Sequence, residues 1–151
     1  MFNNAKNWGR AALLCAIMPL MAACATSGPT FSDLHASEPA VAPNMARIYF
    51  YRMSNFAGSA VQPSVKVNGQ VVGSSVPGGY FYVDEPAGTY EISTTTEVKE
   101  DIQATVKPGE TRYVRLDISM GIFVGHVAPT LVWPEQGASE ITKCHYIGDK
   151  K

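Results

Sequence analysis

From residue 46 onward, the sequence is a series of short segments in which apolar and polar side chains alternate, separated by turn residues. An alternation with a period of two places the apolar side chains on one face of a β-strand. Strand-like segments at a spacing of about 8 to 12 residues, with Gly, Pro and Asn between them, are typical of two packed sheets. The sequence therefore predicts an all-β fold, an antiparallel β-sandwich of about seven to eight strands.

Individual segments carry more specific signals. The segment 64–73 is divided by Asn68-Gly69, a pair that favours a type I′ turn, and it predicts a β-hairpin. The segments 79–85 and 89–96, joined by Pro86-Ala87-Gly88, predict a second hairpin. Further strands are expected at 47–53, which reads as a central strand because both of its faces are apolar or aromatic, at 101–107 and at 111–119.

The C-terminal part of the chain predicts one short helix. Pro134 fits the first turn of a helix over 134–143, because a proline lacks only an N–H group that the first turn does not use. Before it, the apolar segment 120–127 is bracketed by glycines and has two readings. It is either a buried core strand or, with Phe123 exposed, a contact site for a partner or a membrane.

Residues 1–23 have the layout of a secretory signal peptide. Lys6 and Arg10 precede an apolar run of 11 residues, too short to span a bilayer, where a helix needs roughly 20. The string "MAAC", residues 21–24, resembles the lipobox of bacterial lipoproteins, in which the cysteine is acylated and becomes the first residue. Cys24 is therefore the expected lipid-attachment site, and the alternative is an incidental thiol in an ordinary signal peptide.

Resemblance to lipoproteins of Gram-negative bacteria also implies a location. Ala25 follows the cysteine where an inner-membrane retention signal would have Asp, so we expect an N-terminal lipid with palmitate in the outer membrane, on its periplasmic face. Residues 24–45 lack periodicity and are expected to form the lipidated cysteine and a flexible tether, on which Phe31 and Leu34 could dock. The sandwich domain would then span 46–147, with a tail at 148–151.

The charge balance of the mature chain bears on whether it binds nucleic acid. Lys6 and Arg10 lie in the signal peptide, so 10 of the 12 basic residues remain in the mature chain beside all 13 acidic ones. The resulting balance of −3 argues against nucleic acid as a partner, because binding needs a basic face. Of the three cysteines, Cys15 is removed with the signal peptide and Cys24 is acylated, so Cys144 has no disulfide partner and is expected to be buried.

Several motifs together resemble a known family. They are "ARIYFYR" (46–52), "VNGQVVG" (67–73), "GGYFYVDEPAGTYEIS" (78–93), "KPGETRYVRLDIS" (107–119) and "GH" (125–126). In these the chain resembles bacterial lipoproteins that contain domain of unknown function 2846. The resemblance implies an immunoglobulin- or transthyretin-like sandwich on a lipid anchor, and it implies no established activity.

The sequence offers no combination of residues that is typical of catalysis. It has no G-x-S-x-G, no H-E-x-x-H and no paired cysteines at zinc spacing, so we expect neither an enzyme nor a metal or cofactor site. Cys144 and His145 would point to opposite faces of a strand and make a poor catalytic dyad. His126 is expected to be a partly buried structural histidine, with a pH-sensing or ligand-binding role as the alternative.

Five tyrosines fall at alternating positions of three predicted strands and would form one aromatic face. They are Tyr49, Tyr51, Tyr80, Tyr82 and Tyr113. Such a face either binds a sugar or a protein, or is covered by the tether and the late helix. The resulting functional hypothesis is a non-enzymatic binding or adaptor module for an envelope protein, and the alternative is recognition of glycan or peptidoglycan through the tyrosines.

Overall fold

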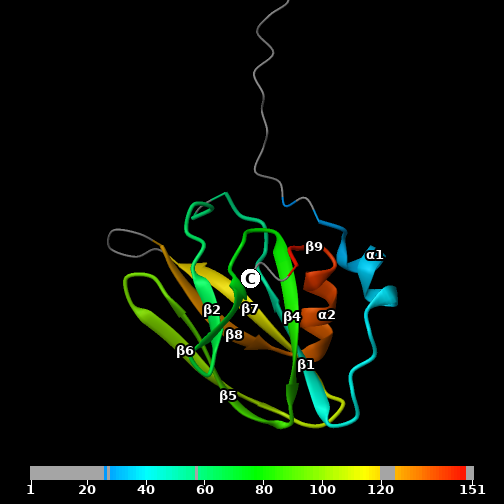
Figure 1. The fold of residues 1–151 in the computed structure, drawn as a ribbon. Coiled ribbons are helices and arrows are strands. Elements are labelled where there is room, and N and C mark those ends of the chain that lie inside the picture. The colour runs from blue at the N-terminus through cyan, green and yellow to red at the C-terminus, as the bar shows by residue number, and fades with distance from the viewer. Residues whose placement is uncertain (1–25, 27, 57, 120–124, 149–151) are drawn as a thin grey trace, which may run out of the picture.

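The computed structural model of the chain describes residues 26, 28–56, 58–119 and 125–148. Two β-sheets pack face to face and two helices lie on the outside of one of them (Figure 1). The fold is an open, all-β sandwich with a short helix near the C-terminus, as the sequence predicts.

The larger sheet contains five strands. In spatial order they are β8 (His126–Val132), β7 (Thr111–Ser119), β1 (Met45–Tyr51), β4 (Gly79–Pro86) and the short β9 (His145–Tyr146). The smaller sheet contains β3 (Gln70–Ser74), β2 (Ser64–Val67), β5 (Gly88–Thr95) and β6 (Lys99–Val106), in that order. The segment 47–53 is confirmed as a central strand, because β1 lies in the middle of the larger sheet.

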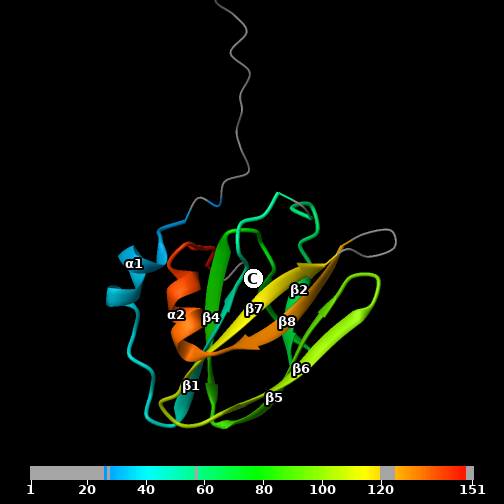
Figure 2. The same ribbon diagram turned by 180° about the vertical axis from the view of Figure 1, so that it is seen from behind.

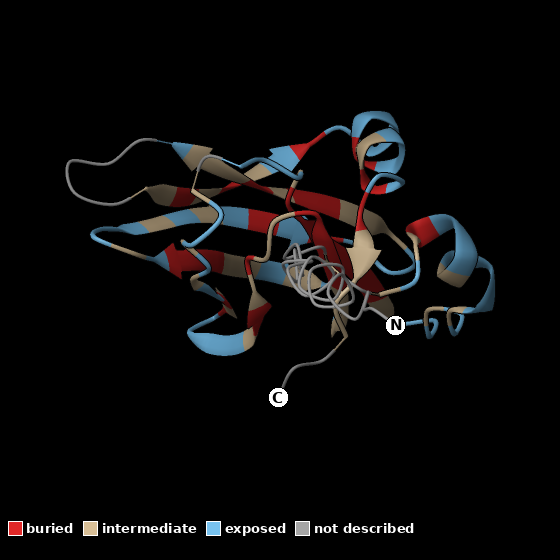
Figure 3. Cartoon of the chain, turned by 90° about the horizontal axis from the view of Figure 1, so that it is seen from above, coloured by how far each residue is buried: buried red, intermediate tan, exposed pale blue. Residues whose placement is uncertain are grey.

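The main core lies between the two sheets. It is formed by the inward-facing side chains of both, among them Ile48, Phe50, Val65, Phe81, Ile92, Val114 and Leu116. The rings of Phe50 and Phe81, from neighbouring strands, stack with centroids 5.0 Å apart. In the view from above, buried residues are found along the strands of both sheets (Figure 3). The inward-facing side chains thus recur at every second position along the strands, for example Ile48 and Phe50 in β1 and Val114 and Leu116 in β7.

The hairpin at Asn68-Gly69 forms as predicted. Strands β2 and β3 are antiparallel neighbours, and Asn68 and Gly69 both have positive φ, of 48° and 80°. A type I′ turn needs this at both central residues, which Asn and Gly adopt at low cost.

The second predicted hairpin is wrong. Strand β4 pairs with β1 and β9 in the larger sheet, whereas β5 pairs with β2 and β6 in the smaller one. The chain therefore crosses from one sheet to the other at Ala87. Alternation shows which side chains of a strand face the core. It does not show to which of the two sheets the strand belongs, because a strand in either sheet turns its apolar side toward the same core.

The larger sheet is mixed, which corrects the expectation of a fully antiparallel sandwich. Strands β1 and β7 are parallel, and so are β4 and β9. The chain leaves the larger sheet after β4, passes through β5 and β6 in the other sheet, and returns in β7 beside β1. A return through the opposite layer allows β7 to enter in the direction of β1, which a tight turn would not.

The segment expected to be a flexible tether is folded over much of its length. It contains α1 (Phe31–Leu34) and a 3₁₀ turn, η1 (His35–Ser37), and Thr30 forms an antiparallel bridge with His145. The predicted docking is confirmed for Phe31, which is buried, and Leu34 is partly buried. This segment folds because its apolar and charged side chains find partners on the sheet.

The predicted late helix is present as α2 (Pro134–Ile141), with Pro134 in its first turn. Helices α1 and α2 lie side by side on the outer face of the five-stranded sheet (Figures 1 and 2). Among the described residues, no helix is long and apolar enough to cross a membrane.

Candidate functional site

The five predicted tyrosines lie together on the outer face of the larger sheet. Tyr49 is opposite Tyr82 on one side and Tyr113 on the other, and Tyr51 is opposite Tyr80. The Tyr49 ring stacks on that of Tyr113 with centroids 5.4 Å apart, and contacts that of Tyr82 edge-on at 5.6 Å. Three adjacent strands with the same alternation thus build the aromatic face that the sequence predicts.

This tyrosine face is covered. Tyr51 and Tyr80 are 0 % exposed, Tyr49 1 % and Tyr113 8 %, whereas Tyr82 is only partly buried. Phe31 of α1 packs edge-on against Tyr49 and Tyr80, with centroid distances of 5.6 and 5.4 Å. These rings therefore fill a second core under the helices, and an incoming sugar would meet them only if the cover moved.

Helix α2 covers the other part of the face. Gly137 lies so close to Tyr113 that a Cβ at this position would collide with Cβ and Cγ of the tyrosine. Ile141 and Cys144 are fully buried in the same cluster. The sequence "PEQGASEI" therefore seats a helix on an aromatic ring, because glycine lets its backbone approach.

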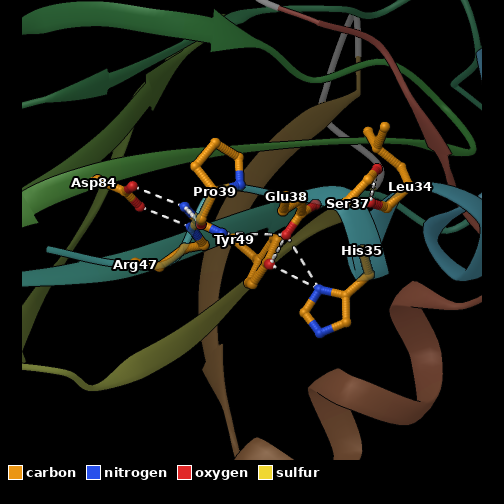
Figure 4. Close-up of polar contacts among 8 residues, drawn as sticks. All are labelled: Leu34, His35, Ser37, Glu38, Pro39, Arg47, Tyr49 and Asp84. Carbon is orange, nitrogen blue, oxygen red and sulfur yellow. Dashed lines mark hydrogen bonds and ion pairs between the residues drawn. The ribbon is translucent and has the colours of Figure 1, made fainter.

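Glu38 fastens the N-terminal segment to the sheet (Figure 4). Its Oε2 accepts hydrogen bonds from the Tyr49 hydroxyl and from Arg47 Nη1, the latter at 3.2 Å, and lies 3.1 Å from His35 Nδ1. The carboxylate side chain is only 3 % exposed, and its Oε1 has no hydrogen-bond partner among the described residues. Burial and the bond to Glu38 raise the pKa of Tyr49, so its hydroxyl stays protonated as a donor.

Arg47 joins this acid to the sheet. Its Nε and Nη2 donate to the two carboxylate oxygens of Asp84, at 2.7 and 2.8 Å, and Nη2 also donates to the Pro39 carbonyl at 2.9 Å. The guanidinium lies 4.1 Å from the centre of the Tyr82 ring. The hydrogen bond to Asp84 raises the pKa of Arg47, although burial opposes it, and such fork-to-fork pairs are the strong ones.

A second acid, Glu140, fastens α2. It accepts hydrogen bonds from the Tyr51 hydroxyl at 2.6 Å, from Arg115 Nη1 at 3.2 Å and from Gln136 at 2.8 Å. Burial alone would raise the pKa of Glu140, but the three donors outweigh it and the net shift is downward. Arg115 is held in turn by Asp117, at 2.7 Å.

A buried arginine shapes the loops at one end of the sandwich. Arg52 is 1 % exposed and donates to the carbonyls of Val61, Ser75 and Gly58 at 2.6, 3.0 and 2.9 Å. Its Nε has no partner among the described residues, and burial lowers its pKa. Arg52 therefore ties the β1–β2 loop to the β3–β4 connection.

His126 lies at the start of β8, next to the β5–β6 turn. Its Nε2 is 3.4 Å from Glu97 Oε2 and its Nδ1 3.4 Å from Thr96 Oγ1, and 15 % of the side chain is exposed. The histidine is partly buried, as the sequence predicts, and its partners are a carboxylate and a hydroxyl. The partners given for it belong to the β5–β6 turn and not to the tyrosine face.

The remaining cysteine and histidines have structural surroundings. Cys144 is fully buried as predicted, its Sγ is 3.6 Å from the Arg52 carbonyl, and burial raises its pKa to about 11. His145 Nδ1 is 2.8 Å from the Gly28 carbonyl. Within the described ranges, no group of three or more His, Cys, Asp or Glu side chains could hold a metal ion. The predictions for Cys24 and Phe123 concern residues outside these ranges.

Sequence reasoning missed Glu38, Arg47, Arg52 and Glu140. A signal for Arg47 exists, because it shares the outer face of β1 with Tyr49 and Tyr51 at a spacing of two. A charged group on a face of that kind needs a partner if the face is covered. Glu38 and Glu140 have no such local signal, since the tyrosines that they bind on the sheet lie 11 and 89 residues away.

Comparison with known proteins agrees with the resemblance seen in the motifs. The comparison with curated proteins gives no match. The family model of a protein of unknown function, DUF2846, matches residues 42–127, which is 86 of the 151 residues and runs from just before β1 to the start of β8. The chain therefore belongs to the DUF2846 family.

Proposed function

We propose that this protein is a lipid-anchored β-sandwich on the periplasmic face of the outer membrane that acts as a non-enzymatic binding or adaptor module in the bacterial cell envelope. The lipobox-like "MAAC" supports the anchor, because the cysteine of a lipobox is the residue that is acylated. The acylated Cys24 would lie two residues before Thr26, the first described residue. Two or three acyl chains hold a protein on a membrane stably, whereas one does not.

The observation that carries a binding role is the exposure of Trp133. This side chain is 77 % exposed between β8 and α2, and Leu131 nearby is 39 % exposed. Trp133 occupies the N-cap of α2 and forms no capping hydrogen bond, although Ser, Thr, Asp or Asn is preferred there. A large aromatic residue used neither for packing nor for capping is the type that dominates protein interfaces.

The polar side chains nearest the aromatic face support a non-enzymatic role. Glu38, Arg47 and Glu140 are bound to one another or to tyrosines that they hold in place. Their contacts account for the seating of α1 and α2, and a catalytic role would have to break them.

The experiment places a photo-crosslinking residue at position 133 in the anchored protein in living cells. The matched control is position 87, which is exposed in the turn between β4 and β5. We expect a discrete protein adduct from position 133 and not from position 87. Adducts from both positions, or from neither in a folded and anchored protein, would contradict an interface at Trp133.

Binding of glycan through the tyrosines remains the alternative function. It needs the N-terminal segment to lift, since Phe31 and Glu38 lie over the rings. Saturable co-sedimentation with purified sacculi, stronger in a Phe31→Ala variant that loosens the cover, would favour it. Sedimentation at background level for both proteins would exclude it.

A further inference from the structure

The folded body of this protein begins very close to Cys24. Thr26 Oγ1 donates a hydrogen bond to the Pro77 carbonyl at 2.8 Å. Tyr146 N donates to the Pro29 carbonyl at 2.8 Å, and Phe31 N to the Cys144 carbonyl at 3.2 Å. A Cβ on Gly28 would collide with the Tyr146 carbonyl, so only glycine allows this approach.

These contacts make residues 28–31 an extra edge of the larger sheet, next to β9. A flexible tether of about 20 residues would reach roughly 25 Å from the membrane. The two residues from Cys24 to Thr26 span at most about 7 Å. An acyl group on Cys24 would therefore hold one end of the sandwich against the bilayer.

The part of this end that lies nearest Thr26 is formed by two loops. The β1–β2 loop (52–63) and the β3–β4 connection (75–78) are joined by Arg52, through the Gly58, Val61 and Ser75 carbonyls. The described N-terminus and both loops lie at the same end of the molecule (Figures 1 and 2).

The chemistry of these two loops suits a lipid surface. Phe56, in the β1–β2 loop, is 95 % exposed. Residues 53–63 and 74–79 contain no Asp, Glu, Lys or Arg, whereas the turn between β6 and β7 at the opposite end contains Lys107 and Glu110. The charged residue of the β1–β2 loop, Arg52, is already buried, so the Phe56 side chain can enter the headgroup region without desolvating a further charge.

We infer that the sandwich stands on the bilayer on this end, with the Phe56 ring in the headgroup region of the leaflet that holds the Cys24 lipid. The inference rests on the proposed acylation of Cys24. The orientation places Trp133 farther from the membrane than Phe56. Val132, just before Trp133, is level with Tyr49 within β1 through its pairing with Tyr113, whereas Thr26 contacts Pro77 beyond the C-terminal end of β1.

The chain offers its own matched probes for this orientation. The sequence has two tryptophans, Trp8 in the proposed signal peptide and Trp133, so the mature protein would carry only Trp133, which lies outside the predicted membrane contact. The double variant Phe56→Trp, Trp133→Phe moves the single tryptophan to the contact. Both mature proteins are purified from cells and their acylation is checked by mass spectrometry. They are then placed in vesicles of phosphatidylethanolamine and phosphatidylglycerol, with or without brominated acyl chains.

We expect the tryptophan introduced at position 56 to shift to shorter emission wavelength in vesicles and to lose most of its emission to the brominated lipid. Trp133 in the otherwise unchanged protein should keep its wavelength and intensity. Equal quenching at both positions, or none at position 56 in an acylated protein that floats with the vesicles, would overturn the inference while the anchor stands.

Two other outcomes would also overturn it. If the emission of the tryptophan at position 56 shifts to the blue only as the density of protein in the vesicle rises, and is not quenched by brominated lipid, this end contacts a second copy of the chain. A mature protein without acylation at Cys24 would remove the proposed anchor and the membrane contact together.

Discussion

Two acids, the buried Glu38 and the partly buried Glu140, hold the covering segments on the outer face of the larger sheet. Glu38 fastens the N-terminal segment through Arg47 and Tyr49, and Glu140 fastens α2 through Tyr51 and Arg115. A buried charge is costly unless it is paired, so each acid stabilises the fold only with its donors in place. The covering of the tyrosine face therefore depends on a few specific side chains.

Replacement of Glu38 by Gln tests the first of these fasteners. The change removes the charge that Arg47 and Tyr49 bind, and it turns one buried oxygen position into an N–H donor without an acceptor. We expect the free energy of unfolding to fall by about 1 to 3 kcal/mol in urea titrations. Glu135→Gln, at an exposed position of α2, is the matched control and should change it by less than about 0.5 kcal/mol. Equal effects of the two changes would contradict the role of Glu38.

The pH dependence of stability tests Glu140. Because its pKa in the folded protein lies below the ordinary value of 4.5, the folded state binds fewer protons than the unfolded state in this range. The contribution of the carboxylate is thus fully present above that pH and is lost as the pH falls through the folded pKa. In urea titrations, the stability difference between wild type and Glu140→Gln should shrink as the medium is acidified below 4.5. A difference that stays constant with pH would contradict this.

At the scale of elements, the sequence predicts local features such as a turn or the start of a helix, but it does not predict which distant strands pair. Asn68-Gly69 predicts its turn, and Pro134 predicts the start of α2, because the relevant backbone angles are set within a few residues. The crossing at Ala87 and the parallel pairing of β1 with β7 depend on contacts between distant segments. Alternation cannot specify them, since the same inward face fits more than one neighbour.

The seat of α2 gives a prediction in which the usual effect of a substitution is reversed. Gly→Ala inside a helix usually stabilises by roughly 0.5 to 1 kcal/mol, but a methyl group at position 137 would collide with the Tyr113 ring. Gly137→Ala should therefore destabilise by about 1 to 3 kcal/mol, as overpacking does. Ser139→Ala, at an exposed position of the same helix, should be neutral or slightly stabilising. A more stable Gly137→Ala protein, by thermal unfolding, would show that the helix is not seated on Tyr113.

At the scale of the whole molecule, the same N-terminal segment packs on the tyrosine face and is bonded to the edge of the larger sheet. The sequence predicted the tyrosines on one face and the docking of Phe31, because both follow from alternation and from apolar character. It could not predict that the tether would be fixed to β9 from Gly28 onward, because that depends on backbone bonds to residues more than 100 positions away. The proposed membrane contact at Phe56 follows from that fixation and from the short distance to Cys24.

The mass of the N-terminal peptide of the mature protein, purified from membranes, tests the central proposal most directly. The account predicts that the chain begins at Cys24 and carries diacylglycerol on its sulfur and an acyl chain on its amino group. It also predicts that a Cys24→Ala variant accumulates as the unlipidated precursor. A mature chain that begins at another residue, or a Cys24→Ala protein that is processed and still fractionates with the membrane, would contradict the account.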